Sequence, residues 1–355
     1  MKLTLDLDAK LPSGALGLAI VPDGSAAFAA CADGAVYFVD LETGEADPFA
    51  EKHSAFASGC VLLPDGQTLI SGGFDGMLLW HDVESGRCLR RVAGHKFWNW
   101  QLALSPDGKR LATTTGQYLP GGWKYEPAPE TEPSVKVFDT STGNRLSAFS
   151  HTPPVMSCAF SPDGQHLAAG NLMGEVRVWD LQAKPDSKPL AQWTSTDFTS
   201  WGTIKSHHYC GGIYGLAFAP DGKSLLCCGM GPMTDPMAGN GKMTWQRWDW
   251  QKGAKLDQIR EGQQGSGLME TVTWHPDGKH FIMAGRQAQG TWNAAVFAAS
   301  DGELVHSLDT KKRITQTRFT SDGKWLILTG ATGQGQPKSG KWPPWGRLQV
   351  YRVAV

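Results

Sequence analysis

The chain has 355 residues, of which 41% are hydrophobic and 19% charged, and it contains 43 glycines and 15 tryptophans. This balance is typical of a globular protein with a substantial core, and the glycines indicate many turns. The formal net charge of −1 provides no general field that would attract nucleic acid or an anionic membrane surface. We therefore expect neither nucleic acid nor a membrane as a partner.

The first residues, "MKLTLDLDAKLPSG", alternate leucine with polar residues. This alternation predicts a strand and lacks the continuous apolar run of a signal peptide. No later stretch approaches the ~20 apolar residues of a membrane helix. The seven cysteines show no CxxC pair and no framework spacing, so we interpret them as reduced thiols. Together these features predict a cytoplasmic protein.

Farther along the chain, a Pro-Asp-Gly turn recurs and divides the sequence into repeats. Proline presets the backbone for a turn, aspartate bonds to the local backbone, and glycine adopts positive φ. Apolar strands flank each copy, so each copy is predicted to be a β-hairpin turn. The seven copies, of which the last replaces proline by serine, begin at Pro22, Pro64, Pro106, Pro162, Pro220, Pro276 and Ser321.

A third strand is predicted about seventeen residues after each proline, as in "AVYFVD", "MLLWHD" and "EVRVWD". A Thr-Gly or Ser-Gly turn often follows, and then a weaker fourth strand. Four antiparallel strands in ~42 residues are typical of one blade of a β-propeller. We therefore predict an all-β chain whose residues 1–355 form a single propeller domain.

With these features in place, the sequence resembles the WD-repeat (WD40) family along its whole length. The resemblance rests on the seven turns, on the pairs Trp179-Asp180 and Trp248-Asp249, and on Gly94-His95 before the third turn. It implies a seven-bladed β-propeller of four-stranded antiparallel blades, with strands named a to d outward from the axis. It also implies protein–protein interaction as the default role, which at the level of fold is only an analogy.

The same resemblance implies buried hydrogen-bond networks of His, Ser or Thr, Asp and Trp inside regular blades. Blades 2, 3 and 4 retain parts of this network, whereas blades 1, 6 and 7 lack most of it. The retained residues are His53, Ser71 and Asp75 with His81 at the Trp position, His95 and Thr113, and His151 and Trp179 with Ala169 at the Ser position.

Closure of the ring is also predicted. The strand "RLQVYRV" is only the third strand of blade 7, and the strand "KLTLDL" at the other end of the sequence belongs to no repeat. Pairing residues 3–7 with this last strand would complete blade 7 and remove an exposed sheet edge. We therefore expect the N-terminal strand to close the propeller.

Blades 3, 5 and 7 carry extra residues between strands b and c, and the connection from blade 4 to blade 5 is also long. In an antiparallel blade the b–c and d–a connections share one face of the ring, here the decorated face, and the a–b and c–d turns share the other, the plain face. Long aromatic-rich loops are typical of ordered, functional segments. The predicted partner-binding residues are Tyr118, Trp123, Tyr125, Trp201, Tyr209, Trp342 and Trp345. Alternatively, these rings pack only on one another and form a lid.

Blade 5 also carries a set of soft potential metal ligands, in the connection that enters the blade and in its strand b and b–c segment. Imidazole, thiolate and thioether groups suit Cu(I) or Zn(II), but the spacing matches no standard zinc motif. Cysteine and methionine also fill apolar gaps, so we expect no cofactor and keep copper or zinc as the less favoured alternative. The set comprises His207, His208, Cys210, Cys228, Met230 and Met233.

Motifs of common enzymes are missing from the sequence, which contains no GxSxG, P-loop or HExxH. We therefore expect a non-catalytic scaffold that holds a protein or peptide partner on the decorated face. The alternative is an enzyme or a soft-metal-binding protein with its site at the mouth of the channel on that face.

Overall fold

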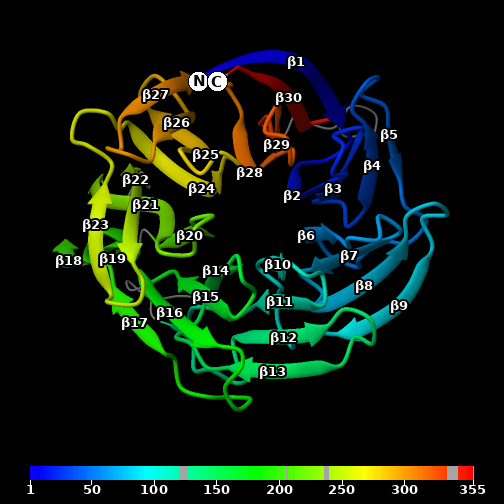
Figure 1. The fold of residues 1–355 in the computed structure, drawn as a ribbon, viewed down its shortest axis with the longest axis horizontal. Helices are drawn as coiled ribbons and strands as arrows, with labels where there is room; N and C mark the ends of the chain where they lie inside the picture. Colours follow the sequence, from blue (N-terminus) through cyan, green and yellow to red (C-terminus); the bar gives the residue numbers. More distant parts are fainter. Residues whose placement is uncertain (120–126, 205–206, 211, 236–239, 334–342, 355) are drawn as a thin grey trace.

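The computed structural model describes residues 1–119, 127–204, 207–210, 212–235, 240–333 and 343–354. Within these residues, seven four-stranded antiparallel blades surround a central axis (Figure 1). The all-β, seven-bladed propeller that the sequence predicts is therefore confirmed. The described part contains one short 3-10 helix, η1 (Thr196–Phe198), and no helix there has the length and apolar character needed to cross a membrane.

Blades 1 to 4 each follow the order a-b-c-d from the axis outward. Their strands are short, which fits a ring in which each sheet is narrow. In chain order they are β2 (Ala15–Ile20), β3 (Ala26–Cys31), β4 (Val36–Asp40), β5 (Ala46–Pro48), β6 (Ala57–Leu62), β7 (Thr68–Gly73), β8 (Met77–Asp82), β9 (Cys88–Ala93), β10 (Leu102–Leu104), β11 (Arg110–Thr114), β12 (Val135–Asp139), β13 (Arg145–Phe149), β14 (Val155–Phe160), β15 (His166–Asn171), β16 (Glu175–Asp180) and β17 (Ala191–Thr194).

Blades 5 to 7 contain longer strands, and a small extra sheet precedes blade 5. Blades 5 and 6 are also joined where Lys242 pairs with Ser266. The strands are β18 (Thr199–Ile204), β19 (His207–Cys210), β20 (Ile213–Phe218), β21 (Leu225–Asp235), β22 (Asn240–Asp249), β23 (Ala254–Gln258), β24 (Ser266–Trp274), β25 (His280–Gln289), β26 (Ala294–Ala298), β27 (Leu304–Leu308), β28 (Arg313–Phe319), β29 (Trp325–Ala331) and β30 (Gly346–Ala354).

Ring closure occurs as predicted. Strand β1 (Lys2–Leu11) pairs antiparallel with β30 and forms the outer strand of blade 7, with Leu3 opposite Val353 and Leu7 opposite Val350. The two ends of the chain consequently lie side by side in Figure 1. The backbone groups of β30 that would form an exposed edge are thereby paired.

The predicted hairpin turns are present, and local hydrogen bonds explain their residue types. In the first turn, Asp23 Oδ1 accepts a hydrogen bond from Ser25 N at 2.9 Å, and Gly24 has φ +76°. In the second turn, Asp65 Oδ1 accepts from Gln67 N at 2.8 Å. An L side chain rarely adopts the φ of Gly24, so glycine is required there.

The buried networks are also present where the resemblance implies them. In blade 2, His53 Nδ1 lies 2.9 Å from Asp75 Oδ1, and Ser71 Oγ lies 2.9 Å from both His53 Nε2 and His81 Nε2. In blade 3, His95 Nε2 lies 2.8 Å from Thr113 Oγ1. The networks join strands to the connections on the decorated face, because His53 and His95 both belong to d–a segments.

The blade 4 network departs from the pattern because Ala169 provides no hydroxyl group. His151 Nε2 instead lies 3.3 Å from the Ala169 carbonyl oxygen. The ring is held mainly by burial, since His151 is 1% exposed and packs near Trp179 with centroids 6.0 Å apart. This burial lowers the pKa of His151 to about 4.

Blade 5 shows one departure from the sequence-based interpretation. Its b–c insertion was expected to be a loop, but β21 and β22 continue into it as a ribbon in which Met233 pairs with Gly241 and Asp235 with Asn240. The connection from blade 4 likewise forms the β18–β19 hairpin. The loop interpretation was wrong for these segments, because strand pairing satisfies backbone groups that an irregular loop would leave open.

Candidate functional site

Five aromatic side chains form a contiguous surface cluster on the decorated face over blades 2 and 3. We call this cluster the aromatic platform. The rings of Phe74 and Trp98 are stacked, with centroids 4.5 Å apart and planes within 5°. All neighbouring rings in the cluster have centroids within 5.6 Å of each other. The platform consists of Phe56, Phe74, Phe97, Trp98 and Trp100.

The platform is unusual because its rings remain open to solvent. Phe56 is 47% exposed and Trp98 39% exposed, while the other three rings are partly buried. A stacked cluster of this size normally lies inside a core, where its apolar area is removed from water. Exposed contiguous apolar surface on a folded protein marks an interaction site more often than an accident of composition.

A buried asparagine holds the segment that carries the two tryptophans. Asn99 is fully buried, and its Nδ2 donates to the carbonyl oxygens of Gly73 and Met77, both at 3.1 Å. Its backbone N–H also donates to Gly73 O at 3.2 Å. Asn99 thus ties the connection between blades 2 and 3 to the b–c turn of blade 2.

Two further hydrogen bonds fix the tryptophans from the side of blade 3. Thr115 Oγ1 donates to Trp98 O at 2.8 Å, and Trp100 Nε1 donates to Gly116 O at 2.7 Å. The Trp100 ring is therefore oriented by its only polar atom, while its apolar faces remain available to the platform. A surface ordered in this way loses little conformational entropy when a partner binds.

The platform continues into the mouth of the central channel. A cavity of about 140 Å³ lies there, and residues from all seven blades or the connections between them line it. Phe74 and Trp100 form one side. The complete lining is Leu16, Ser58, Phe74, Trp100, Gln101, Met156, Tyr214, Glu270, Arg313, Thr315 and Gln316.

An ion pair occupies the opposite side of this mouth. Arg313 Nε donates to Glu270 Oε1 at 2.6 Å, and Arg313 Nη2 donates to Glu270 Oε2 at 2.8 Å. The Glu270 side chain is only 10% exposed. These hydrogen bonds raise the pKa of Arg313 above its ordinary value. The mouth thus combines apolar rings from blades 2 and 3 with a fixed charge pair from blades 6 and 7.

Two of the seven predicted partner-binding residues have described side chains, and both lie outside the platform. Tyr118 is 38% exposed and forms an isolated bridge with Pro127, so the ends of the blade 3 insertion come together. Trp345 is partly buried, and its ring lies against Gly14, where an added Cβ would be 2.5 Å from Cζ3. Trp345 therefore packs at the junction of blades 7 and 1.

The other five predicted partner-binding residues are described incompletely or not at all. Trp201 lies on β18 and Tyr209 on the paired strand β19, but their side chains are outside the described part. Trp123, Tyr125 and Trp342 lie outside the described residues altogether. The proposed binding roles of these five residues stay predictions.

The six residues of the soft metal-ligand set are likewise described only in part. His207, His208 and Cys210 lie on β19 and Met233 on β21, with side chains outside the described part. Met230 is partly buried. In the rest of the described chain, no group of three or more His, Cys, Asp or Glu side chains could hold a metal ion.

Cys228, the remaining member of that set, points into the core between blades 5 and 6. Its side chain is fully buried, and its Sγ lies 3.7 Å from Met269 O. Burial raises the pKa of the Cys228 thiol well above its ordinary value. The neighbouring Cys227 is buried toward blade 4, and burial raises its pKa to about 12. Burial therefore favours the neutral form of both thiols.

Sequence reasoning missed the aromatic platform. It selected connections by their added length, and the segment from Gly94 to Gln101 has the length of a regular d–a connection. The signal that could have found it is the run Phe97-Trp98-Asn99-Trp100. Three aromatic residues in four positions outside a strand require a reason, and only the folded ring shows that Phe56 and Phe74 join them.

Comparison with known proteins identifies repeats of one family within the chain. The model of the family described as "WD domain, G-beta repeat" matches residues 143–180 and 199–231. The chain contains WD repeats. The first match covers strand d of blade 3 through strand c of blade 4, and the second covers the entry into blade 5, its first strand and most of its second strand.

Curated relatives share segments of this sequence. The SAGA complex/transcription factor TFIID complex subunit Taf5 of Schizosaccharomyces pombe is 40% identical over 84 residues, which are 23% of this chain and 13% of that protein. Protein HIR1 of Kluyveromyces lactis is 26% identical over 170 residues, 44% of this chain and 19% of that protein. The serine-threonine kinase receptor-associated protein of Dictyostelium discoideum is 48% identical over 46 residues, 13% of this chain and 16% of that protein. This chain thus matches no more than about a fifth of the length of these relatives.

Proposed function

We propose that this WD-repeat protein is a non-catalytic scaffold that holds a protein or peptide partner on the decorated face, with the aromatic platform as the principal contact. The observation that carries the proposal is the exposure of Phe56 and Trp98 within an ordered, stacked cluster. Aromatic residues are the usual anchors of protein interfaces. The relative Taf5 is named as a subunit of the SAGA complex and the transcription factor TFIID complex, which supports a protein as the partner.

The chemistry of the site suggests what such a partner presents. Flat, exposed rings bind apolar side chains or the planar guanidinium of arginine. The adjacent Glu270 carboxylate is already bonded to Arg313 at two positions, so it is not a free acceptor for a partner cation. A peptide segment with one or two large apolar or arginine side chains therefore fits the platform best.

Three further expectations from the sequence are included in this proposal: the domain extent, the cellular compartment and the cofactor. We propose that residues 1–355 act as one unit in the cytoplasm, without a cofactor, and that Tyr118 extends the contact surface over blade 3. The alternative of an enzyme or a soft-metal-binding protein depends on His207, His208 and Cys210, whose side chains lie outside the described residues. Metal analysis of the purified protein tests it, and a stoichiometric metal would favour the alternative.

The test of the scaffold is a comparison of two surface substitutions. Partners captured from cells by the unsubstituted protein are identified, purified and titrated directly. Trp98→Ala is expected to weaken binding by ~2 kcal/mol or more, about thirtyfold in Kd, as central aromatic anchors do. Leu89→Ala is the matched control, because Leu89 is 64% exposed but lies on the outer strand β9. Equal Kd values for the two variants would refute the platform as the contact surface.

A further inference from the structure

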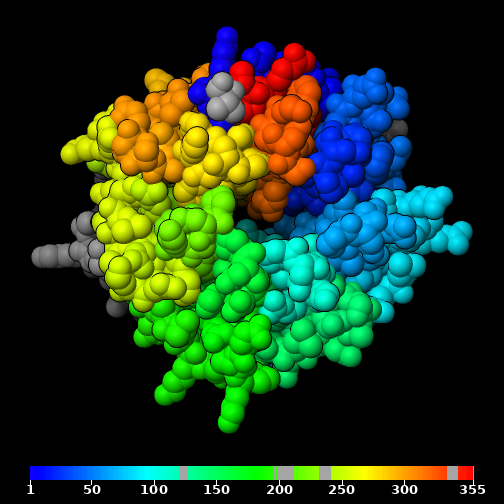
Figure 2. Space-filling model, in the orientation of Figure 1, coloured from blue at the N-terminus to red at the C-terminus, as the bar shows by residue number. Residues whose placement is uncertain are grey.

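The central channel contains a second cavity, separate from the platform. It has a volume of about 450 Å³, and the innermost strands of all seven blades line it. The centre of the ring is visibly hollowed (Figure 2). The lining residues come mainly from the second halves of these strands, next to the a–b turns. The cavity therefore lies toward the plain face, on the other side of the ring from the platform.

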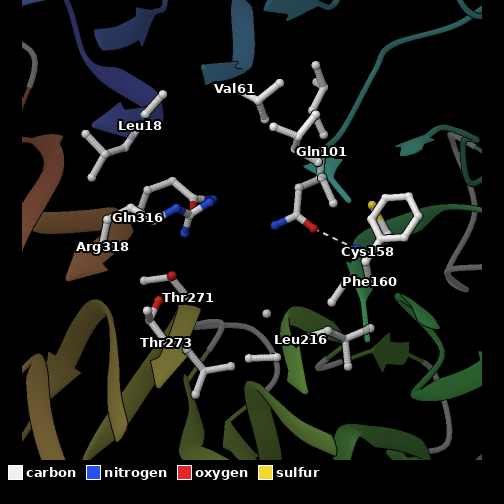
Figure 3. Close-up of a pocket in the computed structure, with 18 of the residues that line it drawn as sticks. Leu18, Val61, Gln101, Cys158, Phe160, Leu216, Thr271, Thr273, Gln316 and Arg318 are labelled. Atoms are coloured by element: carbon white, nitrogen blue, oxygen red, sulfur yellow. Dashed lines mark hydrogen bonds between the residues drawn. The ribbon is translucent and has the colours of Figure 1, made fainter. Parts of the chain in front are cut away.

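Most of the cavity wall is apolar, but one positive charge lies within it. Leu18, Val61, Phe160 and Leu216 form much of the ring (Figure 3). Arg318 extends from β28 toward the middle of the channel (Figure 3). No Asp or Glu is among the residues that line this cavity in the described part of the chain. Arg318 also forms no ion pair with any described residue.

The hydrogen-bonding capacity of Arg318 is only partly used. Its Nη1 donates to Thr317 O at 2.9 Å and to Gln316 Oε1 at 3.3 Å. Its Nε and Nη2 have no partner among the described residues. Burial lowers the pKa of Arg318 from its ordinary value, which means that the cavity destabilises its charge. Arg318 is partly buried, and an anion placed beside a partly buried charge that has no counter-ion lowers the cost of that burial.

Two amide groups add neutral donors at the same level. Gln101 extends into the channel from the side opposite Arg318, and its Oε1 accepts a hydrogen bond from Cys158 N at 2.7 Å (Figure 3). This bond orients the Gln101 Nε2 group, which has no partner among the described residues, toward the cavity. Gln316 is oriented in the same way by Arg318. Both glutamines line the wide cavity and the small mouth cavity, so they mark the boundary between the two.

From this arrangement we infer that the wide cavity binds a monocarboxylate with an apolar body, whose carboxylate lies between Arg318 and the two glutamine amides. A planar carboxylate accepts two hydrogen bonds from a guanidinium. One cationic side chain balances one negative charge, whereas a multiply charged phosphate would remain uncompensated. The leucine, valine and phenylalanine walls suit an aliphatic or aromatic body, and the volume is within the range of small-molecule sites, ~300–1,000 Å³.

The test uses hexanoate as the probe, titrated into the whole protein by calorimetry. Hexanamide, which has the same shape without the charge, and inorganic phosphate are the comparison ligands. Hexanoate is expected to bind at least about tenfold more tightly than either, because hydrogen bonds to a charged group are the stronger kind. Equal affinity for hexanamide, equal affinity for phosphate, or no detectable binding of hexanoate would each overturn the inference.

A second experiment removes the positive charge of Arg318 by substitution. Arg318→Met is expected to weaken hexanoate binding at least about tenfold. Arg145→Met is the matched control, since Arg145 is an exposed arginine on the outer strand β13, and it should bind hexanoate normally. Trp98→Ala should also bind hexanoate normally, so failure of this inference and failure of the platform proposal are distinguishable. Unchanged affinity in Arg318→Met would overturn the inference.

Photolabelling decides the question even if Arg318→Met does not fold. A diazirine derivative of hexanoate should label peptides from the inner strands, including those that contain Gln101 or Gln316. Labelling elsewhere, or none, would overturn the inference. A free acid and the C-terminal residue of a peptide share this chemistry, so a leucine-terminated pentapeptide is titrated as well. If the pentapeptide binds more tightly than hexanoate, the carboxylate that the site recognises is that of a peptide C-terminus. If the pentapeptide binds more weakly, the recognised carboxylate is that of a free acid.

Discussion

The propeller contains two clusters of five aromatic rings with similar geometry and different surroundings. One is the aromatic platform over blades 2 and 3. The other lies between the sheets of blades 5 and 6, where neighbouring rings have centroids between 4.9 and 6.2 Å apart. We call it the core cluster, and it consists of Trp245, Trp274, Phe281, Trp292 and Phe297.

Exposure separates the two clusters, and ring geometry does not. Trp245 and Phe297 are fully buried, whereas Trp98 is 39% exposed. Ring contacts in the core cluster stabilise the fold, because they remove apolar area from water on folding. The platform keeps much of its area in water and removes it only when something binds. The comparison therefore predicts stability effects in blades 5 and 6, and binding effects in blades 2 and 3.

The largest expected effect is that of Trp245→Ala. This substitution should lower the free energy of unfolding by about 3–5 kcal/mol, since it deletes a large, fully buried ring from a packed core. Trp245 Nε1 has no hydrogen-bond partner in the described structure, so the loss reflects packing and not a lost polar contact. Urea denaturation measures it. A loss below about 1 kcal/mol would mean that the core cluster can rearrange, and would break the distinction between the clusters.

Low pH should test the comparison, because blades 2 and 3, which carry the platform, contain two buried histidines whose pKa values are strongly lowered. Burial, and secondarily the His53 charge, lowers the pKa of His81 to about 4. Burial, and secondarily the Lys136 ammonium, lowers the pKa of His95 to about 3. In the unfolded chain both imidazoles have a pKa near 6.5. Between that pH and the lowered pKa of each folded-state histidine, the unfolded state therefore binds more protons than the folded state. Stability is therefore complete above pH 6.5 and is lost as pH falls, by about 2 kcal/mol per histidine at pH 5.

Hydrogen exchange locates this loss. Corrected for intrinsic rates, protection in β8 and β11 should fall between pH 7 and pH 5, while protection in β25 and β26 should change less. Equal loss in all four strands would show that the ring opens as one unit and that the histidines have no local effect.

The sequence predicts the ring well, because the features that build the blades are local. A Pro-Asp-Gly turn needs only its own residues and the adjoining apolar strands, and the closing strand is identified by an incomplete last blade. The networks of His53 and His95 follow from residue identity at fixed positions in a repeat. The platform could not be predicted in the same way, since Phe56, Phe74 and Trp98 come from three different connections that only the closed ring brings together.

The blade 5 ribbon and Cys228 show a second limit of the sequence. Length alone does not distinguish an insertion that continues the strands from one that forms a loop. The direction in which Cys228 points depends on the register of β21, and a shift of one residue would have moved it from the side of blade 6 to that of blade 4.

A smaller effect is expected at the asparagine that holds the platform. Asn99→Ala should cost about 1–3 kcal/mol of stability, because Met77 O loses its side-chain donor and Gly73 O keeps only backbone donors. It should also weaken partner binding, since Trp98 loses its fixed position. The control is Asn144→Ala, at an exposed asparagine. Loss of stability with unchanged affinity would show that the tryptophans are ordered without Asn99.

The smallest expected effect on stability is that of Trp98→Ala, and it is the one that tests the comparison most directly. Trp98 stacks on Phe74 at 4.5 Å and on Phe97 at 4.9 Å, so its contacts are as close as those of Trp245. If contact geometry decided stability, the two tryptophans would be worth the same. Because Trp98 stays 39% exposed, its removal should change the free energy of unfolding by less than about 1 kcal/mol, as expected for a surface position. Urea denaturation of Trp98→Ala beside Trp245→Ala, under one set of conditions, measures the difference.

Trp98→Phe should retain most of the partner affinity, because a flat ring still stacks on Phe74. A Trp98→Ala variant that loses as much stability as Trp245→Ala would make the platform an outlying part of the core, and the binding role would then have to lie elsewhere on the decorated face.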